Sequence, residues 1–182
     1  MSLSWPDPLP ACGQVVLRPF RDSDLGLVAE LSGDPYLPLI GSIPAVYSDE
    51  AALAYLARQH QRLTDGTGYS FAIADRSDDR ALGGASLWPD EGGTLARLGY
   101  AVAPSARRRG VATAALTALT TFAWTLPRLS RLELYIEPVN TGSIRTAERC
   151  GYELEVLLPA HTEIGGEYRD MLRYVRLRTG SG

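Results

Sequence analysis

The sequence predicts one mixed α/β domain in which helices flank a mostly antiparallel sheet. Segments with helical periodicity and segments with β-prone alternation follow one another in the order β-α-α-β-β-β-α-β-α-β-β. Three of the strands come in direct succession, separated only by short, turn-rich breaks, which is typical of an antiparallel meander. With 45% hydrophobic and 21% charged residues, the chain can build a sizeable core, and we expect residues 1–182 to form a single domain.

The N-terminal part supplies the first strand and the first helix. Residues 1–13 contain three prolines and are expected to be a loosely held lead-in. A short strand over residues 14–18 follows. Asp22 or Ser23 can then cap a helix that runs to Gly33.

A long irregular segment separates this helix from the next. Residues 34–47 contain three prolines among apolar side chains, and such loops often form the wall or lid of a binding site. Ser48 then caps an amphipathic helix that ends before Gly66. Its predicted buried stripe consists of Leu53, Leu56, Ala57 and Leu63.

The meander and a second run of alternating elements complete the chain. The meander strands are expected over residues 69–74, 81–87 and 95–102. A helix follows from Val111 to near Pro127, with a buried stripe of Val111, Ala115, Leu119 and Phe122. The last elements are a strand over 131–136, a short helix over 143–149 capped by Asn140 or Thr141, and strands over 153–158 and 168–177.

A short basic turn joins the third meander strand to the following helix. Arg107, Arg108 and Arg109 precede Gly110, where the first amide N–H groups of the helix have no partner within it. The helix dipole and the arginines add positive charge, and a glycine lets a ligand approach the backbone closely. The turn predicts a phosphate or pyrophosphate site, with a solvated basic turn as the alternative. Because the chain has neither Gly-x-Gly-x-x-Gly nor any lysine, the two most familiar phosphate loops are excluded.

Charge and cysteine content exclude several other classes of protein. The formal net charge of −3 argues against a dedicated nucleic-acid-binding protein. No stretch approaches the ~18–20 consecutive apolar residues of a membrane span, and no basic-then-apolar leader opens the chain. Cys12 and Cys150 lie far apart, and the histidines and cysteines are too scattered to predict a metal site. We expect a cytoplasmic protein with no membrane or nucleic-acid partner.

Three motifs occur in order in the middle of the chain. They are the strand and proline at residues 99–104, the Arg107-x-x-Gly110-x-Ala112 turn, and Val139-Asn140-x-x-Ser143 followed by Glu148-Arg149-Cys150-Gly151-Tyr152. Together they resemble the GNAT superfamily of acetyl-CoA-dependent N-acetyltransferases, and the predicted element order agrees with that fold. Residues 17–20, Leu-Arg-Pro-Phe, are similar to the branch that acetylates the N-termini of ribosomal proteins.

The resemblance implies that acetyl-CoA is the acyl donor and that the sheet splays open where it binds. The strand ending at Val102 would diverge from the next strand, leaving main-chain groups for the pantetheine arm. The Val102 N–H would also stabilise the oxyanion. Amides of the basic turn would hold the pyrophosphate, and its arginines would cover the outer phosphates. The implied donor-binding residues are Val102, Arg107, Arg108, Arg109, Gly110, Val111, Ala112, Thr113, Asn140 and Ser143.

The acid and base that the family implies are partly replaced in this sequence. Many members carry a tyrosine acid where this chain has Ala147, and often a strand glutamate at positions 97 and 98, which here hold arginine and leucine. Ser143 is therefore the candidate acid, with a hydroxyl that only caps the helix or contacts the donor as the alternative. Glu163 resembles the acidic residue of the ribosomal-protein branch and is the candidate base. His161 and water are the alternatives for this role.

These residues predict an N-acetyltransferase that moves an acetyl group to a primary amine by direct attack on the thioester. The acceptor is open between a ribosomal-protein or other N-terminus and a small amine such as an antibiotic or metabolite. A catalytically inactive coenzyme A-binding module for regulation or interaction is the alternative, because the usual tyrosine and strand glutamate are missing. GNAT proteins are often homodimers, although no feature of this sequence identifies an interface.

Overall fold

A computed structural model describes residues 3–178 and contains one sheet of eight strands with the order β1-β2-β3-β4-β5-β6-β8-β7. The strands are β1 (Ala11–Cys12), β2 (Val15–Arg18), β3 (Tyr69–Asp75), β4 (Ala81–Pro89), β5 (Leu95–Val102), β6 (Arg131–Ile136), β7 (Glu153–Ile164) and β8 (Glu167–Leu177). All neighbouring strands are antiparallel except β5 and β6, which run parallel. The predicted mixed α/β fold and its meander β3-β4-β5 are confirmed.

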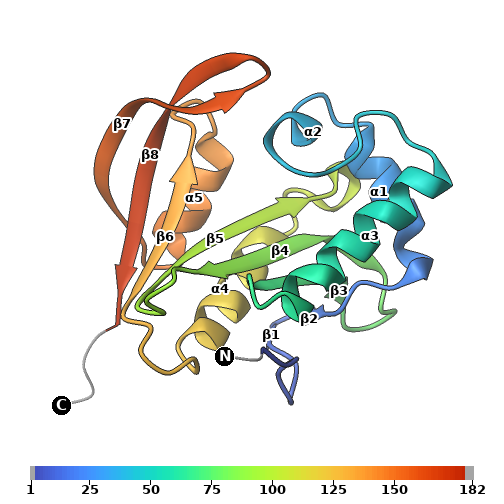
Figure 1. Ribbon diagram of the computed structural model, residues 1–182, viewed down its shortest axis with the longest axis horizontal. Coiled ribbons are helices and arrows are strands. Elements are labelled where there is room, and N and C mark those ends of the chain that lie inside the picture. The colour runs from blue at the N-terminus through green and yellow to red at the C-terminus, as the bar shows by residue number, and fades with distance from the viewer. Residues whose placement is uncertain (1–2, 179–182) are drawn as a thin grey trace.

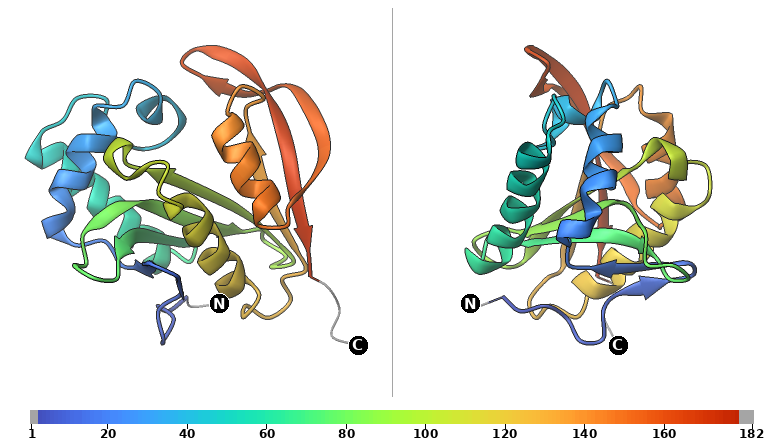
Figure 2. Two further views of the ribbon diagram at one scale, coloured as in Figure 1. Left: turned by 180° about the vertical axis from the view of Figure 1, so that it is seen from behind. Right: turned by 90° about the vertical axis from the view of Figure 1, so that its right-hand side faces the viewer.

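Helices cover both faces of this sheet (Figures 1 and 2). They are η1 (Asp22–Asp24), α1 (Leu25–Ser32), α2 (Leu37–Ile40), α3 (Asp49–Thr64), η2 (Pro104–Ala106), α4 (Val111–Ala123) and α5 (Thr141–Arg149). Helices α1 and α3 pack together on one face, and α4 and α5 lie on the other. None of the helices within residues 3–178 has the length and apolarity needed to cross a membrane.

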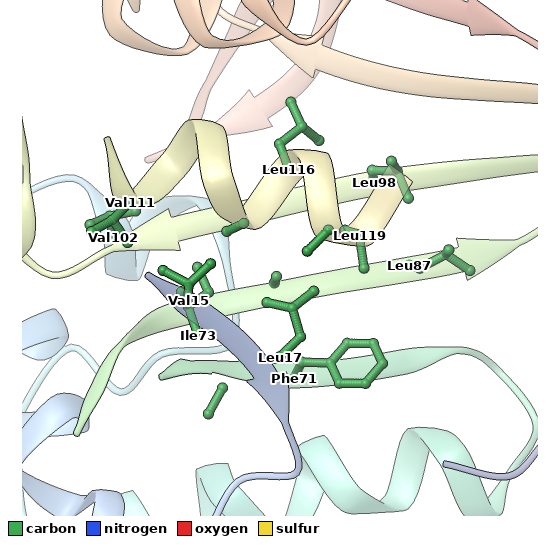
Figure 3. Packing of buried hydrophobic residues seen from close by; sticks show 14 of the residues in the cluster. Val15, Leu17, Phe71, Ile73, Leu87, Leu98, Val102, Val111, Leu116 and Leu119 are labelled. Carbon is green, nitrogen blue, oxygen red and sulfur yellow. The ribbon is translucent and has the colours of Figure 1, made fainter. Parts of the chain in front are cut away.

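Helix α4 supplies the centre of the core. Its predicted stripe of Val111, Ala115, Leu119 and Phe122 is buried, as expected from the helical spacing of these residues. Figure 3 shows Val111 and Leu119 on the side of α4 that faces the strands. The helix thereby holds its first turn against the end of β5, which carries Val102.

The buried face of α3 differs from the predicted stripe. Leu56 of that stripe is buried as predicted and Leu63 is partly buried, but Leu53 is 43% exposed and Ala57 is exposed. The helix also buries Ala52, Tyr55 and Gln59. Gln59 can be buried because both ends of its amide are hydrogen-bonded. Its Nε2 donates to Tyr55 O at 3.1 Å, and its Oε1 accepts from Ser70 Oγ at 3.0 Å. Aliphatic spacing alone therefore predicts a face of α3 rotated away from the real one.

Both ends of the described chain are more ordered than the sequence predicts. In the lead-in, β1 pairs with β2, and the ring of Trp5 packs edge-on against Phe71 with centroids 5.3 Å apart. At the other end, β7 continues through the segment around His161 and Glu163 that was predicted to be a loop. Pairing with β8 carries it across a register shift between Leu158 and Thr162.

The parallel pair β5 and β6 is short, and this feature positions the site. Only Leu95, Ala96 and Arg97 of β5 pair with β6. Beyond that point β5 continues to Val102 and β6 to Ile136 without pairing to each other. The predicted splay of the sheet is thus present, and Figure 1 shows the two strands diverging between α3 and the β7–β8 hairpin.

Candidate active site

The diverging half of β5 turns main-chain groups toward β6. Ala103 N–H donates to Leu82 O of β4 at 2.9 Å, which makes these two residues a hydrogen-bonded pair across the antiparallel strands. Hydrogen bonding to one neighbour alternates along an antiparallel strand, so the N–H and C=O groups of Tyr100 and Val102 point away from β4. These groups face the gap that β6 leaves, where an extended ligand can pair with them as an added strand.

The turn before α4 is shaped by two left-handed residues. Arg108 has φ of +61° and Gly110 has φ of +76°. Gly110 is the N-cap of α4, and no side chain within residues 3–178 caps the helix there. A Cβ at Gly110 would meet no atom within 4 Å, so the backbone is open to a ligand at this point. Open amides at a helix N-terminus next to exposed Arg108 and Arg109 suit a pyrophosphate.

Arg107 is bonded to two groups of the protein, although its side chain remains 45% exposed. Its Nε donates to Val102 O at 3.1 Å, and its Nη2 lies 2.6 Å from Asp34 Oδ2. The other oxygen of Asp34 accepts from the amides of Tyr36 and Leu37. Burial alone would raise the pKa of Asp34, but these amides and the guanidinium outweigh it and lower the pKa. Arg107 therefore joins the turn to the loop after α1.

A cavity of about 400 Å³ lies against the diverging strands. Its floor includes Leu98–Ala101 of β5, residues 134–136 of β6 and Glu137, which follows β6. Its walls come from the loop after α1, from α3, from the start of α5 and from β7. The predicted residues Asn140, Ser143 and Glu163 all line it. The fold thus brings Asn140 and Ser143 at the start of α5 close to Glu163 of β7 around one cavity.

Asn140 and Ser143 meet at the start of α5. Asn140 Oδ1 accepts from the Ser143 N–H at 3.0 Å, so the predicted helix cap is present. Tyr100 of β5 reaches the same turn and donates its phenol to Ser143 O at 3.4 Å. Burial raises the pKa of Tyr100, which keeps this phenol protonated near neutral pH. Ala147, where many family members carry tyrosine, is fully buried.

Of the two predicted base candidates, Glu163 lines the cavity and His161 does not. His161 stacks on Tyr135 with ring centroids 5.1 Å apart, and its Nδ1 lies 2.9 Å from Thr162 Oγ1. The strand β7 therefore presents a carboxylate, not an imidazole, to the cavity.

The sequence did not predict a partly buried pair of side chains in the cavity, Tyr36 and Glu137. Tyr36 of the loop after α1 donates its phenol to Glu137, which follows β6 and is only 8% exposed. Burial and the neighbouring carboxylate raise the pKa of Tyr36, so it stays protonated and continues to donate. The signal in the sequence was an acidic residue directly after a buried strand, but nothing local identified its partner 101 residues away.

Comparison with known proteins identifies the family. The family model described as an acetyltransferase (GNAT) domain matches residues 14–153. The chain belongs to the GNAT acetyltransferases. It is 29% identical over 126 residues to "Probable N-acetyltransferase YjcK" of Bacillus subtilis, covering 68% of this chain and 70% of that protein.

Solved structures share the fold over nearly the whole chain of this GNAT protein. Mycobacterium smegmatis RimJ in complex with CoA-disulfide has a TM-score of 0.81 at 24% identity, covering 96% of this chain and 90% of that chain. RimL, a ribosomal α-N-protein acetyltransferase in complex with coenzyme A, has a TM-score of 0.79 at 20% identity, covering 93% and 97%. The predicted resemblance to the branch that acetylates ribosomal proteins is thus confirmed at the level of the fold. The protein is an acetyltransferase.

Proposed function

We propose that this GNAT enzyme transfers the acetyl group of acetyl-CoA to a primary amine by direct attack of the amine on the thioester. One observation carries the proposal: the cavity is lined by the parts of β5 and β6 that diverge. Main-chain groups open to a donor and polar side chains suited to proton transfer therefore lie around one space. When bound, acetyl-CoA supplies an acetyl thioester that is activated toward amines.

The donor would be held by the basic turn and the gap. Amides from Arg108 to Thr113, including those of Gly110, Val111 and Ala112, would bind the pyrophosphate, with Arg108 and Arg109 adding charge. The main chain of Tyr100 would pair with the pantetheine amides, and Asn140 and Ser143 would contact the same arm. Arg107 would act differently from its neighbours, because its side chain is already engaged with Asp34.

Four groups of this chain would handle protons and charge. Glu163 would accept a proton from the acceptor ammonium, which makes the amine nucleophilic. The Val102 N–H, directed at the gap, would donate to the carbonyl oxygen as it gains negative charge. Ser143 would supply a proton to the departing sulfur, with the Tyr100 phenol beside it as a second donor. The similarity to RimJ and RimL favours a protein N-terminus as acceptor, with a small amine as the alternative.

Calorimetry and an amine assay test this function together. Acetyl-CoA is titrated into the wild type, into Gly110→Asp and into Gly110→Ala. Both variants place a Cβ at φ of +76°, a conformation that residues other than glycine disfavour, but only aspartate adds negative charge at the turn. We expect Gly110→Ala to bind and Gly110→Asp, confirmed as folded by circular dichroism, to lose binding. Wild type should also release coenzyme A when peptide and small primary amines are added. A wild type that binds acetyl-CoA but acetylates no amine would refute the proposed transfer.

A further inference from the structure

A second polar cluster lines the cavity on the side of α3. Arg62, in the last turn of α3, is half-buried and faces the cavity with Trp88 of β4, whose ring centroid lies 5.5 Å from the guanidinium carbon. Arg62 Nη1 donates to Ser70 Oγ at 2.9 Å, and Nη2 lies 3.4 Å from Ser42 Oγ. Ser70 is in turn bonded to Ser86, another residue of the cavity wall, at 2.9 Å. The guanidinium is thus held in position by neutral groups.

No carboxylate compensates this charge. Within residues 3–178, Arg62 takes part in no ion pair, whereas six other arginines do: Arg18, Arg21, Arg107, Arg131, Arg169 and Arg173. Burial lowers the pKa of Arg62 and the neighbouring Arg58 lowers it further; the Tyr55 phenol acts in the opposite direction, and no carboxylate is among the causes. A half-buried guanidinium with N–H groups to spare is stabilised when a carboxylate approaches it from the cavity.

The acidic residues of the cavity come from its other side. Glu137 follows β6 and Glu163 belongs to β7, both beyond β5, whereas Arg62 belongs to α3, which packs on β3 (Figure 1). Arg62 is the one basic residue among the cavity-lining residues that the structure describes. The cavity therefore has a positive wall and a negative wall.

We infer that the acceptor carries a carboxylate as well as an amine, and that Arg62 binds this carboxylate. The inference rests on the proposed amine transfer and narrows its substrate class to amino acids, or to peptides with an acidic group near the N-terminus. The ammonium lies toward Glu137 and Glu163, and the carboxylate forms a charge-assisted hydrogen bond with the guanidinium. Arg62 is a specificity-determining residue in this arrangement and takes no part in the transfer step.

Matched acceptor pairs test the inference. Each pair has an amine with and without a carboxylate: phenylalanine and phenethylamine, γ-aminobutyrate and butylamine, and amidated Ser-Asp-Ala and Ser-Asn-Ala peptides. In wild type, kcat/KM should favour the acidic member of at least one pair by roughly tenfold to a hundredfold. Arg62→Met should abolish that preference by raising KM for the acidic member, while activity on its neutral partner stays within about twofold. A merely structural role would lower activity on both members equally.

Arg58 supplies the control. It lies on the same helix one turn earlier, is exposed, and also touches Ser42, through the Ser42 carbonyl at 3.0 Å, but it does not line the cavity. Arg58→Met should therefore keep the preference. Equal use of both members of every pair by wild type, or an unchanged preference in Arg62→Met, would overturn the inference while leaving amine transfer intact.

A binding measurement separates this failure from failure of the proposed function. The same acceptor pairs are titrated by calorimetry into the protein in the presence of coenzyme A. Because coenzyme A carries no acetyl group, this experiment measures acceptor binding without turnover. If no acceptor is acetylated, the proposed transfer fails. The inference then stands on binding alone: carboxylate-selective binding that Arg62→Met removes supports it, and no such selectivity overturns it.

Discussion

Arg107 Nη2 lies 2.6 Å from Asp34 Oδ2, although the two residues are 73 positions apart in the chain. This ion pair ties the turn before α4 to the loop that forms one wall of the cavity. Two residues further along the same loop, Tyr36 donates to Glu137 after β6. The loop is thus anchored both to the donor turn and to the floor of the cavity.

Loss of Arg107 should therefore disturb the cavity wall more than donor binding. Arg107→Gln removes a partly exposed ion pair, and we expect a loss of about 1 kcal/mol in the free energy of unfolding together with a higher KM for the acceptor. The control is Arg108→Gln in the same turn, whose exposed side chain should affect KM for acetyl-CoA and leave the acceptor KM unchanged. The two variants are compared by steady-state kinetics and thermal unfolding. Identical kinetic profiles would contradict separate roles for the two arginines.

The pair should also make stability depend on pH in the acid range. The pKa of Asp34 is lower in the folded protein than the value of about 3.9 expected for an unfolded chain, so its carboxylate stabilises the fold above that value. This contribution is lost as the pH falls through the lower, folded pKa. The Tm difference between wild type and Asp34→Asn should be constant from pH 8 to pH 5 and shrink below about pH 4. A difference that stays constant or widens on acidification would refute the prediction.

The phenol of Tyr36 should be important because it bonds a buried carboxylate. Tyr36→Phe removes the donor to Glu137, and we expect a loss of about 1–3 kcal/mol in urea unfolding. Glu137→Gln keeps an oxygen that accepts from Tyr36 and should cost less stability, while lowering kcat/KM for amine acceptors by removing a negative charge. Tyr47→Phe is the control, since the Tyr47 phenol bonds Asp49 at the exposed surface. Its unfolding free energy should stay within about 0.5 kcal/mol of wild type.

Asn140 should have two separable roles. As the cap of α5 it accepts from the Ser143 N–H, and Asn140→Ala should destabilise the protein by about 1 kcal/mol. Asn140→Asp keeps an oxygen for this cap and should preserve the Tm. If Asn140 also contacts acetyl-CoA, the aspartate variant will still bind the donor more weakly in calorimetry. Unchanged affinity in a stable Asn140→Asp would limit the residue to capping.

Local features of the sequence were sufficient to predict most of the elements and the basic turn before α4. The cap at Ser48, the prolines after the strands and the stripe of α4 each depend on residues a few positions apart, because helices and turns are built from short-range hydrogen bonds. The order of the motifs around Gly110 and Asn140 likewise indicated the family that the comparison established.

Tertiary structure decided which side chains meet in the cavity. The pairs Arg107–Asp34 and Tyr36–Glu137, and the position of Arg62 opposite two carboxylates, all join segments from different elements. A polar side chain can be buried only if the folded chain supplies a hydrogen-bond partner. Gln59 on the buried face of α3 is an example, because its Oε1 accepts from Ser70 of β3 and its Nε2 donates to Tyr55 O. The sequence alone predicted most of the elements and the open basic turn before α4 of this acetyltransferase, because both depend on nearby residues. The acceptor cavity and its charge arrangement emerged only from the packing of distant segments around the gap between β5 and β6.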